Sequence, residues 1–259
     1  MTINPAAMQP GSELQGKVAL VTGATRNIGR SIALSLAAGG ATVAVNSRAL
    51  REDGDKVVAE IRAAGGQAET FVADISDGPA IYKMVDDIVA RFGRVDLLVL
   101  NANSRKYRPF IEMSFEEWRS VLGLTLDGSF HCIKACLPHM IEAGGGAIVT
   151  LGGLQALSGA KNRVHGSVVK HGLVGMTRAL ALEVAQHKIR INCVAPGATN
   201  TSDVRGEDVA VRPAPSTTIP LGFKAEPEEI AAVVRFLCGP GASFITGQTL
   251  HVNGGQMMF

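Results

Sequence analysis

Val18 to Gly29 reads VALVTGATRNIG, and this stretch decides the fold that we expect for the chain. Its first four residues are apolar and predict a buried strand, whereas Ile28, Ile32 and Leu36 recur at helical spacing and predict a helix. A tight turn joins the two. The backbone N–H groups at the start of such a helix, together with the positive end of its dipole, favour an anion, and the anion that we expect here is a pyrophosphate.

Three residues suit this turn to a ligand. Gly23 lets a ligand approach the backbone, Gly29 lets the helix pack closely on the sheet, and Asn27 tolerates a left-handed conformation. Ordinary strand-to-helix turns also carry glycine, so the interpretation as a nucleotide site depends on the rest of the chain.

Composition limits the classes of protein to which the chain can belong. With 259 residues, 46% of them hydrophobic and 19% charged, we expect one globular domain over 14–259, preceded by a loose extension over 1–13. The net charge of +2 is too small to favour nucleic acid as a partner. The apolar runs are too short for a membrane span and the N-terminus lacks a signal-peptide pattern, so we expect a cytoplasmic protein. The four cysteines form no CxxC pair, and we expect neither disulfides nor a metal site.

Strand and helix patterns alternate along the rest of the chain. Further strands are predicted at 41–45, 68–73, 96–100, 146–151, 190–194 and 249–252. Helices are predicted at 52–64, 77–92, 114–140, 163–185 and 227–237. Apolar strands that alternate with helices are typical of a parallel sheet covered on both sides. We therefore predict a Rossmann-type, doubly wound α/β fold, whose ligands bind beyond the carboxyl ends of the strands.

Several motifs occur in the order and spacing of one known family. They are TGATRNIG at 22–29, Asp74 in VADIS, the pair Asn101-Ala102, Lys170 within a helix, PGATNT at 196–201 and ITGQTLHVNGG at 245–255. In these motifs the chain from Leu14 onward resembles the short-chain dehydrogenases/reductases. The resemblance implies a nicotinamide dinucleotide cofactor.

The resemblance also implies where the cofactor binds. Asp74 and Ile75 would flank the adenine, Asn101 and Ala102 would lie under the cofactor, and Thr201 would bind the nicotinamide carboxamide. The complete set of expected cofactor-binding residues is Gly23, Thr25, Arg26, Asn27, Ile28, Gly29, Ser47, Arg48, Asp74, Ile75, Asn101, Ala102, Lys170, Pro196, Gly197, Thr199 and Thr201.

The residues after the second strand bear on the choice of nicotinamide cofactor. An acidic residue there would bind the ribose 2′-hydroxyl of NAD and repel the 2′-phosphate of NADP. This chain has Ser47 at that position, followed by Arg48, and Arg26 in the glycine turn can reach the same side. Two guanidinium groups suit a phosphate, so we expect NADP(H) in preference to NAD(H). The alternative is that both arginines are solvated surface charges.

The catalytic residues that the resemblance implies are largely missing. The family pattern is an Asn, a Ser, a Tyr and a Lys, in which the Tyr gives a proton to the developing alkoxide and the Lys lowers the pKa of the Tyr. Lys170 matches, but the Tyr position is Gly166, the Ser position is Gly153 and the Asn position is Thr125. Neither glycine has a side-chain proton to give.

Three functions fit this altered pattern. The first is an atypical oxidoreductase that takes its proton from His165 or from a water bound to Lys170. His165 lies about 140° around the helix from Lys170, so it does not clearly face the same pocket. The second is a non-catalytic NADP(H)-binding partner of an active homologous subunit, and the third is an enzyme with a non-redox reaction such as elimination, cyclisation or cleavage. We favour the first because the nucleotide motifs are complete.

Two basic segments would border the substrate pocket and attract an anionic small molecule or an acyl thioester. They contain Arg105, Lys106, Arg108, Lys161 and Arg163. Solvated surface charge is the alternative for each of them. The segment 199–220 has the composition of a mobile lid. The resemblance also implies self-association as a tetramer or dimer, through the helices at 114–140 and 163–185 and the C-terminal segment 248–259, with a homologous subunit as a further possible partner.

Overall fold

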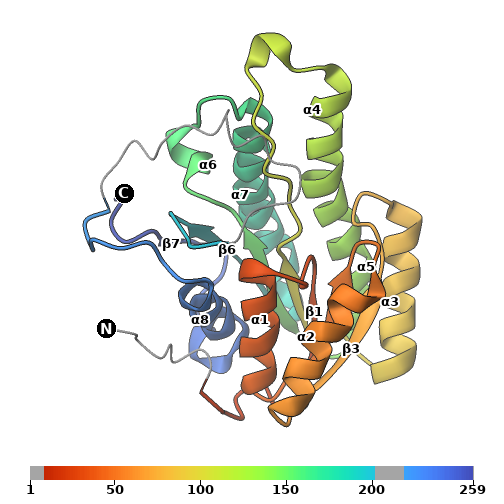
Figure 1. Cartoon of the computed structure of the whole chain (residues 1–259). Coiled ribbons are helices and arrows are strands. Elements are labelled where there is room, and N and C mark those ends of the chain that lie inside the picture. The colour runs from red at the N-terminus through yellow and green to blue at the C-terminus, as the bar shows by residue number, and fades with distance from the viewer. Residues whose placement is uncertain (1–8, 202–218, 259) are drawn as a thin grey trace.

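The computed structural model describes residues 9–201 and 219–258, so most of the expected lid lies outside the described residues. Seven parallel strands form a single sheet in the order β3-β2-β1-β4-β5-β6-β7 (Figure 1). They are β1 (Val18–Val21), β2 (Thr42–Ser47), β3 (Gln67–Val72), β4 (Leu97–Leu100), β5 (Gly146–Leu151), β6 (Ile189–Pro196) and β7 (Thr249–Val252). The predicted doubly wound α/β fold is confirmed. The strand order reverses between β1 and β4, and a ligand crevice is expected at such a point.

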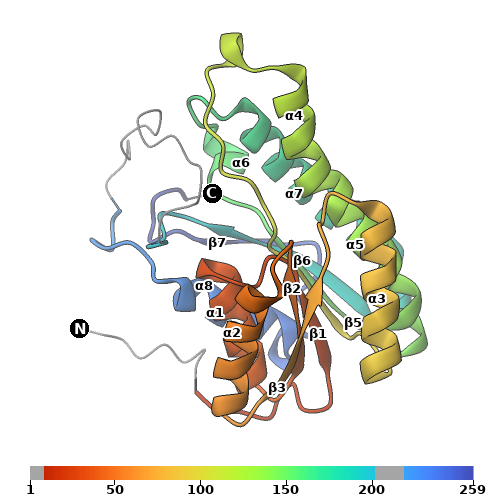
Figure 2. The ribbon, with the colours of Figure 1, turned by 45° about the vertical axis from the view of Figure 1, so that its right-hand side comes forward.

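Helices cover both faces of the sheet. One layer holds α1 (Asn27–Ala38), α2 (Arg51–Ala63) and α8 (Pro227–Cys238), and the opposite layer holds α3 (Gly78–Phe92), α5 (Gly128–Glu142) and α7 (Val164–Val184), as Figure 2 shows. The side chains of β1 alternate between the two cores: Ala19 and Val21 pack in the first, Val18 and Leu20 in the second. A strand buried on both faces must be apolar throughout, which explains the run VALV.

The long helical region predicted at 114–140 is present, and it contains a π-helical turn. The helix α4 (Phe115–Leu122) is capped by the Ser114 hydroxyl, which accepts a hydrogen bond from the backbone N–H of Glu117 at 3.1 Å. The π-helical turn, Gly123–Asp127, then connects α4 to α5 without a break in the helical backbone. The sequence did not reveal this turn, because a single wide turn hardly disturbs the apolar period on either side of it.

The first residues that the structure describes contact the rest of the fold. Residues 9–13 contact the fold: the N–H of Gly11 donates to the carbonyl of Ala38 at 2.8 Å, and Glu13 forms an ion pair with Arg235 of α8.

Within 9–201 and 219–258, none of the helices is both long enough and apolar enough to cross a membrane.

Candidate functional site

A cleft of about 2010 Å³ lies beyond the carboxyl ends of the strands, where the strand order reverses. Every residue expected to bind the cofactor lines this cleft except Thr201. The Thr201 hydroxyl instead accepts a hydrogen bond from Nη1 of Arg105, at 2.8 Å, and Arg105 does line the cleft. The fold thus brings together residues that are far apart in the sequence, from the glycine turn after β1 to the loop after β6.

The glycine turn between β1 and α1 follows the geometry expected of it. Gly23 has a φ of 60° and Asn27 a φ of 48°, so both adopt left-handed conformations. A side chain on Gly29 would collide with the carbonyl of Gly23, and one on Gly23 would lie 3.1 Å from Cα of Ala102. Gly29 therefore permits close packing of the helix against the turn and against Asn101, which directly follows β4.

A buried amide holds this turn in place, and sequence reasoning missed it. Oδ1 of Asn46 accepts a hydrogen bond from the N–H of Gly23 at 3.0 Å, and its Nδ2 donates to the carbonyl of Ala73 at 3.0 Å. Asn46 thereby ties the turn after β1 to the end of β3. The signal was a polar residue inside the apolar strand that contains Ala44 and Val45.

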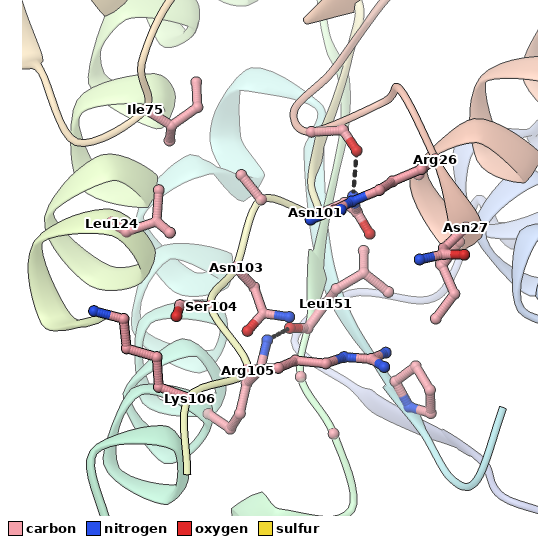
Figure 3. A pocket seen from close by; sticks show the side chains of 18 of the residues that line it. Arg26, Asn27, Ile75, Asn101, Asn103, Ser104, Arg105, Lys106, Leu124 and Leu151 are labelled. Atoms are coloured by element: carbon pink, nitrogen blue, oxygen red, sulfur yellow. Dashed lines mark hydrogen bonds between the residues drawn. The ribbon is translucent and has the colours of Figure 1, made fainter. Parts of the chain in front are cut away.

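Asn101 holds the turn from the other side. Its Nδ2 donates to the carbonyls of Thr22 and Gly23, each at 3.0 Å, and the Thr22 hydroxyl accepts hydrogen bonds from the backbone of Asn101 and Ala102. Figure 3 shows Asn101 in the wall of the cleft, with a hydrogen bond drawn from it. These contacts fix the backbone under the expected cofactor position. Asn101 is thus a positioning residue for the turn as well as part of the cleft wall.

The end of β2 carries the residues expected to select the cofactor. Ser47 is buried, and its hydroxyl donates to the carbonyl of Leu50 at 2.6 Å. The guanidinium groups of Arg26 and Arg48 are exposed and line the cleft. Of the residues considered for the 2′-phosphate, the two arginines therefore present free charge, whereas the serine hydroxyl is engaged within its own loop.

Lys170 is buried in the wall of the cleft. Its Nζ donates to the carbonyl of Leu151 at 2.6 Å, which is the interaction drawn at Leu151 in Figure 3. Burial is the largest influence on its pKa and lowers it to about 7; Cys193 acts in the opposite direction, and the cations Arg163 and Arg105 lower the pKa further. A Cβ added to Gly153 would have Cγ of Lys170 as its nearest neighbour, at 4.0 Å. The place of the missing Ser is therefore open space beside Lys170.

The guanidinium group of Arg163 lies next to Gly166, the position at which the family pattern has its Tyr. A Cβ added to Gly166 would lie 3.1 Å from Nε and 3.2 Å from Nη2 of Arg163. The guanidinium group of Arg163 also lies over the ring of Tyr107, 4.9 Å from its centroid, and Arg163 lines the cleft. A cation thus occupies the space next to Gly166.

The structure places three predicted site residues away from the cleft. His165 is buried outside the cleft lining, and burial, with the charge of Arg163, lowers the pKa of its ring. Thr125 is buried in the π-helical turn, although its neighbour Leu124 lines the cleft. Arg108 does not line the cleft, because it points toward Glu117, with 3.3 Å between Nε and Oε2. The position of His165 agrees with its helical spacing from Lys170. The expected positions of Thr125 and Arg108 in the cleft are corrected, because the direction in which each side chain leaves its helix or loop decides its place.

The part of the chain that the structure describes holds no group of three or more His, Cys, Asp or Glu residues able to bind a metal. All four cysteines are buried free thiols. The polar chemistry of the cleft therefore rests on the amides, hydroxyls and cations described above.

Comparison with known proteins identifies relatives over nearly the whole chain. A family model described as enoyl-(acyl carrier protein) reductase matches residues 23–257. The chain is 37% identical over 244 residues to 3-oxoacyl-[acyl-carrier-protein] reductase FabG of Staphylococcus aureus, which covers 93% of this chain and 98% of the relative. It is 34% identical over 245 residues to the FabG of Thermotoga maritima, with 95% and 99% coverage.

Solved structures share the fold. A putative short-chain alcohol dehydrogenase from Sinorhizobium meliloti 1021 has a TM-score of 0.87 at 34% identity, covering 95% of this chain and 98% of its own. A 7α-hydroxysteroid dehydrogenase, complexed with NADH and 7-oxo glycochenodeoxycholic acid, has a TM-score of 0.87 at 30% identity, covering 99% of each chain. With matching sequence motifs, strand order and relatives, the chain belongs to the short-chain dehydrogenase/reductase family.

Proposed function

We propose that this protein is an NADP(H)-binding oxidoreductase that acts on a carbonyl or hydroxyl group of an anionic small molecule or an acyl thioester. The observation that carries the proposal is the single cleft in which the glycine turn, the two exposed arginines and Lys170 meet. The names of the Staphylococcus aureus and Thermotoga maritima relatives support an acyl thioester as one substrate class.

The residues of the turn fit a dinucleotide. The first turn of α1 has no acidic residue, and its N-cap residue, Arg26, makes no side-chain hydrogen bond to the helix. Such a helix start leaves N–H groups available to a pyrophosphate. When bound, the nicotinamide cofactor supplies or accepts a hydride; the protein's own part is to orient it through the turn and Lys170.

Exposed Arg26 and Arg48 support NADP(H) over NAD(H), because each can form charge-assisted hydrogen bonds to a 2′-phosphate. Calorimetric titration with NADPH and NADH tests this directly. Tighter binding of NADH would refute the preference, and binding of neither would remove the cofactor from the proposal.

The absence of side-chain hydroxyls at Gly153 and Gly166 favours a second candidate, a non-catalytic subunit or an enzyme with a non-redox reaction. Turnover separates the two candidates. Oxidation of NADPH with any ketone, oxo acid or 3-oxoacyl thioester supports the oxidoreductase. If NADPH binds but no member of that panel is reduced, the second candidate replaces the first.

Exposed apolar side chains support self-association as a tetramer or dimer. Phe115 of α4 and Phe130 of α5 are exposed, and so are Val168 and Leu182 of α7, the last at 85%. Large apolar side chains are buried at stable subunit interfaces more often than they face water. Light scattering of the purified chain tests this, and a stable monomer at micromolar concentration would contradict it. Rescue of an insoluble chain by a co-expressed homologue would instead indicate a mixed assembly.

A further inference from the structure

Arg163 carries a buried positive charge that the described part of the protein does not neutralise. The residue is only 4% exposed, and its Nε has no hydrogen-bond partner among the residues that the structure describes. None of the ion pairs found within 9–201 and 219–258 includes it; the nearby carboxylate of Glu117 pairs with Arg108 instead. A buried charge is unfavourable unless it is paired, so we expect this guanidinium to bind an anion.

The protein supplies only part of what Arg163 needs. The ring of Tyr107, 4.9 Å away, offers a cation–π interaction. Such a contact supports the guanidinium from one face and leaves the buried Nε–H without an acceptor. The neighbouring groups add positive charge, since Arg163 and Arg105 both act electrostatically on Lys170. All three cations line the same cleft.

The position of Arg163 places this anion site at the reaction centre and not at the rim. Its Nε and Nη2 lie beside Gly166, which is one turn from Lys170 on the same helix. The space at Gly153 also adjoins Lys170, because a Cβ added there would lie 4.0 Å from its Cγ. An anion held by Arg163 in this cleft would therefore have Lys170 as a second cation of the same wall.

We propose that Arg163 binds a carboxylate group of the substrate beside Lys170, so that the preferred substrates are oxo- or hydroxycarboxylic acids whose carboxylate lies next to the reacting carbon. This inference rests on the proposed oxidoreductase function and narrows its substrate class. A guanidinium matches a carboxylate with two parallel hydrogen bonds, and it does not release its own proton, so Arg163 binds and does not act as an acid. An acyl thioester, which is neutral at its reacting end, gains nothing from this site.

Matched acid and ester ligands test the proposal. Calorimetry on the protein saturated with NADP⁺, which cannot reduce an oxo acid, compares pyruvate and 2-oxobutanoate with methyl pyruvate, in wild type, Arg163→Gln and Arg163→Lys. Arg108→Gln is the control, because Arg108 is a cation of the same region that does not line the cleft. We expect the acids to bind more tightly than the ester, and Arg163→Gln to weaken the acids by about 10- to 100-fold, as for loss of a charge-assisted hydrogen bond. Arg163→Lys should retain part of the affinity, and neither Arg108→Gln nor binding of the ester should change.

A second measurement separates ligand binding from a structural role. Without ligand, Arg163→Gln should unfold at the same temperature as wild type or a higher one, because it removes an unpaired buried charge; a large fall would indicate that Arg163 serves the fold and would overturn the proposal. Equal affinity for acid and ester, no binding of either acid, or an unchanged affinity in Arg163→Gln would also overturn it. If NADP⁺ fails to bind, the acids are titrated into the free protein, so the proposed function can fail while the anion site is still tested.

Discussion

Restoring the missing side chains should convert this cleft toward the reduction of neutral ketones, provided that Arg163 is removed at the same time. The change is the triple variant Gly153→Ser, Gly166→Tyr and Arg163→Ala. A Cβ at 153 would have Cγ of Lys170 as its nearest neighbour beyond the adjoining residues, at 4.0 Å, so a serine fits there. A tyrosine at 166 is different, because its Cβ would lie 3.1 to 3.4 Å from three atoms of the Arg163 guanidinium.

The magnitude follows from what a positioned acid contributes. A general acid accelerates proton transfer by about 10²- to 10⁴-fold, which corresponds to roughly 3 to 5 kcal/mol of activation free energy. We expect a gain of that order in kcat/KM for a neutral ketone in the triple variant. Gly166→Tyr alone should gain much less, because Arg163 then competes for the space of the ring.

The assay follows NADPH oxidation by absorbance with cyclohexanone and ethyl acetoacetate as neutral substrates. Lys170→Ala added to the triple variant should abolish the gain, since the tyrosine then lacks the ammonium that lowers its pKa. Gly153→Ser alone is the matched control and should change little. Wild-type turnover within tenfold of the triple variant would show that Gly153 and Gly166 do not mark the reaction centre, or that their missing hydroxyls are not required.

Three further predictions test other parts of the site. Burial lowers the pKa of Lys170 from 10.5 to about 7, so between these pH values the unfolded chain holds a proton that the folded protein has released. The free energy of unfolding should therefore rise with pH from about 7 toward 10. Urea titrations at several pH values should show this rise in wild type and not in Lys170→Met. Asn46→Leu leaves the N–H of Gly23 and the carbonyl of Ala73 without their partner and should cost about 1 to 3 kcal/mol per group in denaturant unfolding, with weaker NADPH binding. Arg48→Asp should weaken NADPH binding and reverse the preference toward NADH in calorimetry, whereas an unchanged ratio would remove Arg48 from the phosphate site.

The fold could be read from the sequence because its strands are buried on both faces. Residues such as Ala19 and Leu20 point into opposite cores, and both must be apolar, so each strand appears as a continuous apolar run between turn residues. Three features escaped this reasoning. The π-helical turn at Gly123–Asp127 barely changes the helical period, the short helix α6 (Gln155–Ser158) is too brief to show one, and Asn46 acts through contacts with residues distant in sequence.

The sequence predicts the site only where the position of the backbone determines which residues line the cleft. The carboxyl ends of parallel strands meet at one edge, which is why the loops after the first six strands, β1 to β6, could be assigned to one cleft. Side-chain direction is not fixed in this way. Arg163 and Arg108 belong to two basic segments that looked equivalent, yet one turns into the cleft and the other toward Glu117.

The glycine at 166 and the buried Arg163 are best understood together. A Cβ at 166 would lie 3.1 to 3.4 Å from the guanidinium of Arg163, so a tyrosine there would require the guanidinium to shift, and this chain holds a cation where the family resemblance implies a neutral proton donor. A fixed cation stabilises an anionic oxygen but cannot protonate it. The proposed reduction would then need another proton source, and Lys170, whose pKa burial lowers to about 7, or a water bound to it, would supply that proton. Bound carboxylate would raise that pKa again, so substrate binding and proton supply are coupled through the same three cations.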